Sequence, residues 1–144
     1  MTQLRDPGST ATRTNRLGCV LAVLVNAAGL VVLHVWPGWE ELPFLTDEAW
    51  DVLPFVDAAL VAGIVVNVVL LARRPGWPIA AGTLVTTVFG LVASVEVLSV
   101  FPFDVSPTWA TLLRVVLVFG IVGAVLGILA LLVSLLRLRQ VEGR

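Results

Sequence analysis

The stretch that decides the fold is WATLLRVVLVFGIVGAVLGILALLVSLL, residues 109–136, in which Arg114 is the one charged side chain. A helix needs about 20 apolar residues to cross a membrane, and this stretch is longer. At about 1.5 Å per residue it exceeds a hydrocarbon core of about 30 Å. We therefore expect a spanning helix that tilts or extends beyond the membrane.

Three further apolar stretches pass the same length test, at about 17–36, 55–72 and 79–101. Proline breaks the hydrogen-bond ladder inside a helix, so its positions test the four boundaries independently. All eight prolines lie at the margins of these stretches or outside them, at Pro7, Pro37, Pro43, Pro54, Pro75, Pro78, Pro102 and Pro107. The sequence therefore predicts four transmembrane helices.

The composition supports a membrane environment for the whole chain. Of its 144 residues, 58% are hydrophobic and 13% are charged, whereas a soluble domain is about half apolar and about a quarter charged. The mean hydropathy is +1.01. These values exclude a soluble enzyme, a nucleic-acid-binding protein and a disordered tail. The predicted fold is an all-α, antiparallel four-helix bundle in the membrane.

The charges are distributed asymmetrically although the formal net charge is only −1. Arginines occur before the first span, between the second and third, and after the fourth, at Arg5, Arg13, Arg16, Arg73, Arg74, Arg137, Arg139 and Arg144. In the other two loops every charged residue is acidic, at Glu40, Glu41, Asp47, Glu48, Asp51 and Asp104. The positive-inside rule then predicts an inner-membrane protein with cytoplasmic tails at 1–16 and 137–144 and an acidic outer loop at 37–54.

The outer loop contains a helix-start signal, in which the Thr46 hydroxyl is followed by two acids. We expect a short helix here, lying on the membrane surface with Trp50 and Leu53 on one side. The acids lack the spacing and the turn glycine of a calcium loop, so a solvated loop is the better interpretation. The tryptophans are expected to anchor the membrane interfaces, at Trp36, Trp39, Trp50, Trp77 and Trp109.

Small and amide side chains at helical spacing predict close helix packing, because such residues let backbones approach each other in lipid. The residues that we expect to mediate it are Asn26, Asn67, Gly82, Gly90, Gly123 and Gly127. Asn26 and Asn67 extend the small-residue rows of the first two spans. Each amide could form a hydrogen bond to the other or to a backbone carbonyl.

Four ionisable side chains remain inside the predicted spans, at His34, Asp57, Glu96 and Arg114. All four fall in the outer leaflet, and charges there usually face protein, water or each other. Glu96 and Arg114 lie at similar depth on consecutive helices, which predicts an ion pair that clamps these helices together. The functional alternative is a water-filled vestibule in which the four groups bind an ion, a proton or a small polar ligand.

The motifs Trp36-Pro37-Gly38-Trp39 and Phe101-Pro102-Phe103-Asp104 leave the first and third spans. In this plan the chain resembles small four-span membrane proteins of high-GC bacteria. The resemblance covers most of the membrane region, and it implies no activity and no site residues. The chain departs from small multidrug-resistance transporters, because its first span contains no glutamate.

These patterns leave two classes of function open. The leading hypothesis is a non-enzymatic scaffold, accessory subunit or oligomer-forming module whose partners are the lipid bilayer and copies of itself or another membrane protein. The rival is a small transporter or channel that uses the outer-leaflet polar cluster. A membrane enzyme ranks third, because no nucleophile or metal set accompanies the acid–base groups. The single cysteine, Cys19, and the single histidine predict no metal, cofactor or disulfide site.

Overall fold

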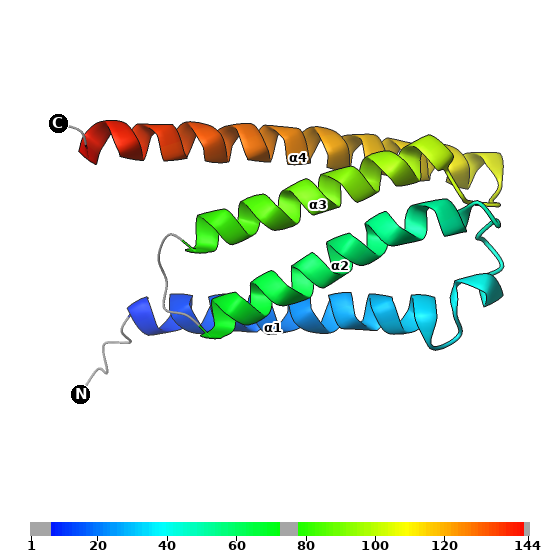
Figure 1. Cartoon of the computed structure of the whole chain (residues 1–144), viewed down its shortest axis with the longest axis horizontal. Coiled ribbons are helices and arrows are strands. Elements are labelled where there is room, and N and C mark those ends of the chain that lie inside the picture. The colour runs from blue at the N-terminus through cyan, green and yellow to red at the C-terminus, as the bar shows by residue number, and fades with distance from the viewer. Residues whose placement is uncertain (1–6, 73–77, 143–144) are drawn as a thin grey trace.

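The computed structural model describes residues 7–72 and 78–142, and side chains within 16–72 and 81–133. In these ranges the chain forms four α-helices and one short 3-10 helix (Figure 1). The bounds are α1 Pro7–His34, η1 Trp39–Glu41, α2 Ala49–Ala72, α3 Pro78–Val100 and α4 Pro107–Glu142. Each α-helix is long and apolar enough to cross a membrane. The prediction of an all-helical chain with four helices long and apolar enough to span a membrane is therefore confirmed.

The four helices lie side by side in a row, with successive helices running in opposite directions (Figure 1). Extensive contacts join α1 to α2, α2 to α3 and α3 to α4, and α1 does not pack extensively on α4. The compact bundle expected from the sequence is thus open in this structure. Lipid tails remove the hydrophobic drive between helices, so nothing forces the two edge helices to close into a ring.

At one end of the row, which we call the loop end, the segments 35–48 and 101–106 meet. The Thr46 amide donates a hydrogen bond of 3.1 Å to the Pro102 carbonyl, and the Asp104 amide donates one of 2.9 Å to the Phe44 carbonyl. An antiparallel bridge between Leu45 and Phe103 lies between these bonds. The two hairpin connections are therefore joined through their backbones.

The best-buried side chains lie at this loop end rather than in the middle of the spans. Ala49, Val52 and Leu53 are 2%, 4% and 6% exposed, and Pro102 is completely buried. The short surface helix predicted at this position is wrong, because its residues form the first turns of α2. Pro54 lies inside α2 without ending it, since it removes only one backbone donor from an early turn.

The helix ends follow local sequence signals. Three helices begin at a proline, at Pro7, Pro78 and Pro107, where the fixed φ suits a first helical position and the missing N–H costs nothing. The chain leaves α1 through Gly38, whose φ of 94° favours glycine. It leaves α3 through Phe101, a non-glycine residue with a φ of 48°. This left-handed residue turns the chain sharply and places the adjacent Pro102 in the buried cluster.

Candidate functional site

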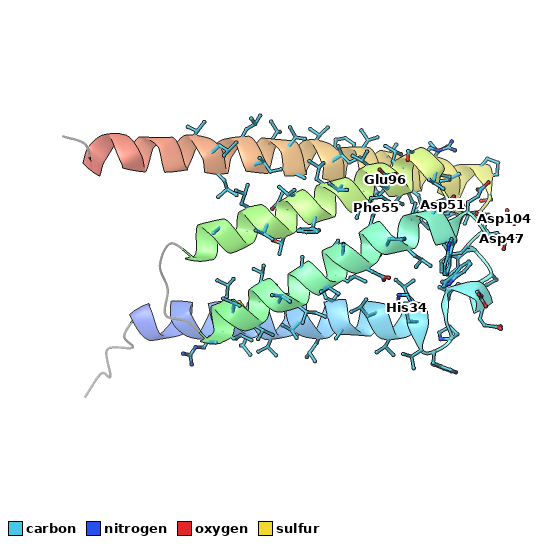
Figure 2. The ribbon with its side chains drawn as sticks, in the orientation of Figure 1. His34, Asp47, Asp51, Phe55, Glu96 and Asp104 are labelled. Atoms are coloured by element: carbon cyan, nitrogen blue, oxygen red, sulfur yellow. The ribbon has the colours of Figure 1, made fainter. Side chains whose placement is uncertain are left out.

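The strongest polar contact between helices joins His34, in the last turn of α1, to Asp57 of α2. Nε2 of His34 lies 2.8 Å from Oδ1 and 2.9 Å from Oδ2 of Asp57. The two side chains are 45% and 30% exposed. Figure 2 shows His34 at the end of α1 that faces the loops. Within the described side chains, 16–72 and 81–133, this is the one ion pair.

The register between α1 and α2 brings this pair together. A Cβ on Gly63 of α2 would lie 2.8 Å from Oδ1 of Asn26, and a Cβ on Gly29 of α1 would lie 3.3 Å from the Leu60 methyls. In an antiparallel pair, moving toward the loop end along α1 means moving toward the start of α2. His34 lies about two turns beyond Asn26 on α1, and Asp57 lies about two turns before Gly63 on α2. The glycines therefore set the close approach that the polar pair requires.

A cavity of about 310 Å³ opens beside His34, between the end of α1 and η1. It is lined by both apolar and acidic side chains, among them Leu33, His34, Pro37, Trp39, Glu40 and Glu41. The Trp39 ring packs at 6.1 Å on that of Trp50, tilted by 46°. His34 thus contacts Asp57 and also lines the cavity to which Glu40 and Glu41 belong.

The predicted ion pair between Glu96 and Arg114 is wrong. The Arg114 guanidinium lies instead over the Phe101 ring, with its Cζ 4.2 Å from the ring centroid. Phe101 also contacts Phe103 edge-on, at 5.3 Å. The left-handed turn at Phe101 folds this ring back beneath α4, where a cation–π contact takes the place of the carboxylate. Glu96 is part-buried on α3 and forms no ion pair within the described side chains.

The structure therefore divides the four predicted ionisable residues instead of gathering them. His34 and Asp57 form one pair on α1 and α2, and Arg114 contacts an aromatic ring where α3 leads into α4. Sequence reasoning placed all four residues in the outer leaflet and did not pair His34 with Asp57. Opposite formal charge favoured Glu96 and Arg114 instead.

The acidic residues of the loops form a separate group. Figure 2 shows Asp47, Asp51 and Asp104 together at the loop end, around the start of α2. Among the described residues, no three histidine, cysteine, aspartate or glutamate side chains come together in a way that could hold a metal ion.

Two of the expected packing residues are amides that bond within their own helices. Nδ2 of Asn26 donates to the Ala22 carbonyl at 2.6 Å, and Nδ2 of Asn67 donates to the Gly63 carbonyl at 2.7 Å. Of the two alternatives left open by the sequence, the backbone-carbonyl alternative is the one observed. Both amides thus satisfy their polar groups locally, while Asn26 fills the space above Gly63.

The expected glycine contacts are found in only part of the row. A Cβ on Gly82 of α3 would lie 2.7 Å from Cγ1 of Val66, so this glycine contacts α2 closely. Ideal Cβ atoms on Gly90, Gly123 and Gly127 meet nothing within 4 Å. These three glycines therefore make no such close contact with another helix within the described part of the chain, and their role in helix packing stays a prediction. Gly123 and Gly127 are open because α4 lies at the edge of the row and has a neighbouring helix on one side only.

Comparisons with known proteins identified no relative of this chain. No family model, no curated protein and no solved structure matches the chain.

Proposed function

We propose that the protein is a non-enzymatic, multi-pass inner-membrane module that associates laterally through α4, first of all with a second copy of itself. The observation that carries the proposal is the open glycine row of α4. Gly120, Gly123 and Gly127 have no side chain and no neighbour within 4 Å of an ideal Cβ. Small residues three and four positions apart share one helix face, and such faces let a second helix approach closely in lipid.

The row architecture supports this proposal. No side chain is buried in the apolar segments Arg16–His34 of α1 and Pro107–Val133 of α4. In a closed bundle, faces of both helices would be covered by the chain itself. In the row they are left to lipid or to a partner. A scaffold or an accessory subunit would use the same open face, with a different membrane protein as its partner.

The membrane orientation that we propose follows from the arginines. The loop end carries acids, whereas all arginines except Arg114 occur in the sequence at or beyond the opposite helix ends. Both chain termini are then cytoplasmic, and the loop end faces outward. In this orientation the open glycine row of α4 lies within the hydrocarbon region, where a second helix could replace lipid.

The experiment is native mass determination of the full chain released from lipid nanodiscs. We expect a dimer or a larger homo-oligomer for the natural sequence. Replacing Gly123 and Gly127 together by leucine fills the row, and it should reduce the oligomeric fraction at least about tenfold, equivalent to about 1.4 kcal/mol. Val118→Leu with Val125→Leu is the matched control, since both valines are exposed on another side of the same helix. A natural chain that is monomeric in lipid would overturn self-association.

A small transporter or channel is the second candidate, and the His34–Asp57 pair is the observation that favours it. Partly exposed ionisable groups at one end of a membrane domain are frequent in ion and proton pathways. Flux measurements in liposomes test this candidate. Asp57→Asn should abolish flux in a transporter, whereas a lateral-association module shows no flux above protein-free liposomes with either sequence.

A further inference from the structure

The contact between His34 and Asp57 differs in kind from the rest of the α1–α2 interface. The neighbouring contacts there, Asn26 on Gly63 and Gly29 on Leu60, depend on shape. Among the described side chains of these two helices, His34 and Asp57 make the one hydrogen bond that crosses between them. The attachment of the last turn of α1 to α2 therefore depends on a group that can change its charge.

The charged residues on the described elements beside the loop end of α1 are acidic. Asp57 approaches from α2, and Glu40 and Glu41 of η1 line the cavity beside the imidazole. In the described part of α1 itself, the nearest other charged residue is Arg16, at the opposite end of the span. Helices α3 and α4 do not pack extensively on α1. A protonated His34 would thus be a cation in direct contact with the Asp57 carboxylate.

The strength of the contact depends on the proton. With an imidazolium at 34, both partners of the bond from Nε2 to the Asp57 carboxylate are ionised, so a Coulomb attraction adds to the hydrogen bond. A neutral imidazole donates from Nε2 in only one of its two tautomers, and in the other tautomer Nε2 repels the carboxylate oxygens. Histidine is also the side chain whose charge ordinarily changes between about pH 5 and pH 8.

We propose that His34 and Asp57 form a proton-operated latch that holds the loop ends of α1 and α2 together when the imidazole is protonated. Loss of the proton weakens the attachment of the last turn of α1, and with it η1, which begins five residues later. Because both side chains are partly exposed at the loop end, the latch responds to the pH of the compartment that the loops face. This response goes beyond lateral association, which needs no proton.

The test is a distance measurement between spin labels on either side of the latch. Labels at Val35→Cys and Phe55→Cys, in a Cys19→Ser background, lie next to the pair on exposed positions. The full chain is studied in lipid nanodiscs, diluted with unlabelled protein so that only intramolecular distances are read. We expect one narrow distance at pH 5 and an additional population at a longer distance at pH 8.

Variants assign the response to the pair. His34→Gln remains neutral and should give the same distribution at both pH values, whereas His34→Arg keeps a permanent cation and should stay closed at both. Asp57→Asn should broaden the distribution of label-to-label distances at pH 5. Glu40→Gln with Glu41→Gln, the matched control, should leave the pH response in place. Circular dichroism of each variant verifies that the helices are intact.

Two results would overturn the latch. One is a natural sequence with the same distance distribution at pH 5 and pH 8. The other is a pH response that persists in His34→Gln, which would assign the titrating group to the glutamates of η1 or to another acid of the loop end.

Discussion

Gly63 of α2 lies directly beneath the side chain of Asn26 of α1, so that an added Cβ would come within 2.8 Å of the amide oxygen. The amide cannot turn away freely, because its Nδ2 donates to the Ala22 carbonyl at 2.6 Å. A methyl group at 63 would therefore break this hydrogen bond or push the two helices apart. Glycine at this position is what allows the close approach on which the His34–Asp57 register depends.

Gly63→Ala should destabilise the chain by about 1–3 kcal/mol, the usual cost of overpacking a tight interface. Reversible unfolding in mixed micelles measures the free energy of unfolding. Gly18→Ala is the matched control on α1, since its added Cβ meets open space. The control should be neutral or slightly stabilising through its better helix propensity. Equal losses in the two variants would contradict the close contact.

Gly82→Ala tests the α2–α3 interface in the same way. Its Cβ would lie 2.7 Å from Cγ1 of Val66, and a β-branched side chain has little rotamer freedom in a helix. We expect a loss of about 1–3 kcal/mol. Val66→Ala in the same chain should recover part of it by making room for the methyl group. Gly90→Ala, on the open part of α3, should leave the free energy of unfolding unchanged. If Val66→Ala does not recover stability in the Gly82→Ala chain, the contact between these two residues is not the source of the loss.

The partner of Arg114 can be decided by two double-mutant cycles. Arg114→Gln combined with Phe101→Leu should show a coupling energy of about 0.5–1 kcal/mol, as expected for a partly exposed cation–π contact. Arg114→Gln combined with Glu96→Gln should be additive, because the two side chains form no ion pair. The measurement is again the free energy of unfolding in micelles. Coupling between Glu96 and Arg114, together with additivity between Phe101 and Arg114, would instead support the ion pair predicted from the sequence.

Pro102 is expected to hold the two loops together. Its ring is completely buried, and its carbonyl accepts the Thr46 amide at 3.1 Å. Pro102→Gly removes the ring and frees the backbone, so we expect a loss of about 2 kcal/mol and faster proteolysis within 37–48. Limited proteolysis in micelles, followed by mass spectrometry, measures the change. Pro43→Gly, at an exposed proline of the same loop, should leave the cleavage rate nearly unchanged.

The orientation predicted from the arginines is tested by cysteine labelling in a Cys19→Ser background. Asp104→Cys should react with a membrane-impermeant maleimide added outside intact cells or spheroplasts. A cysteine at Gln3 should react only after the membrane is opened. Reaction of both positions from the same compartment would refute the four-span topology. Reaction of Gln3 alone from outside would invert it.

Much of the fold could be predicted from local sequence features. Apolar length predicted four helices, and the prolines at 7, 78 and 107 mark helix starts in the structure. The helix-start signal at Thr46 predicted a helix at this position, but not that this helix continues as α2. The helix continues through Pro54 because Ala49, Val52 and Leu53 gain burial under the joined loops, and that burial exists only once α3 and its loop are in place.

The candidate site was predicted only in part, for a similar reason. Depth along each span placed His34 and Asp57 at one level, because a helix advances by a fixed rise per residue. Depth does not specify which way a side chain points around its helix axis. The rotation was set by Gly63 and Gly29, against which Asn26 and Leu60 pack. The Phe101 backbone, turned into the left-handed region, gave Arg114 an aromatic partner that spacing alone did not reveal.

The sequence by itself determined that this chain crosses a membrane as four helices, because the cost of burying backbone polar groups in hydrocarbon leaves the helix as the only solution for such apolar stretches. Tertiary structure decided how those helices meet. Helix–helix contacts in lipid gain little from hydrophobicity and depend on small differences in shape and hydrogen bonding. Such differences pair His34 with Asp57, place Arg114 on Phe101, and leave the glycines of α4 open at the edge of the row.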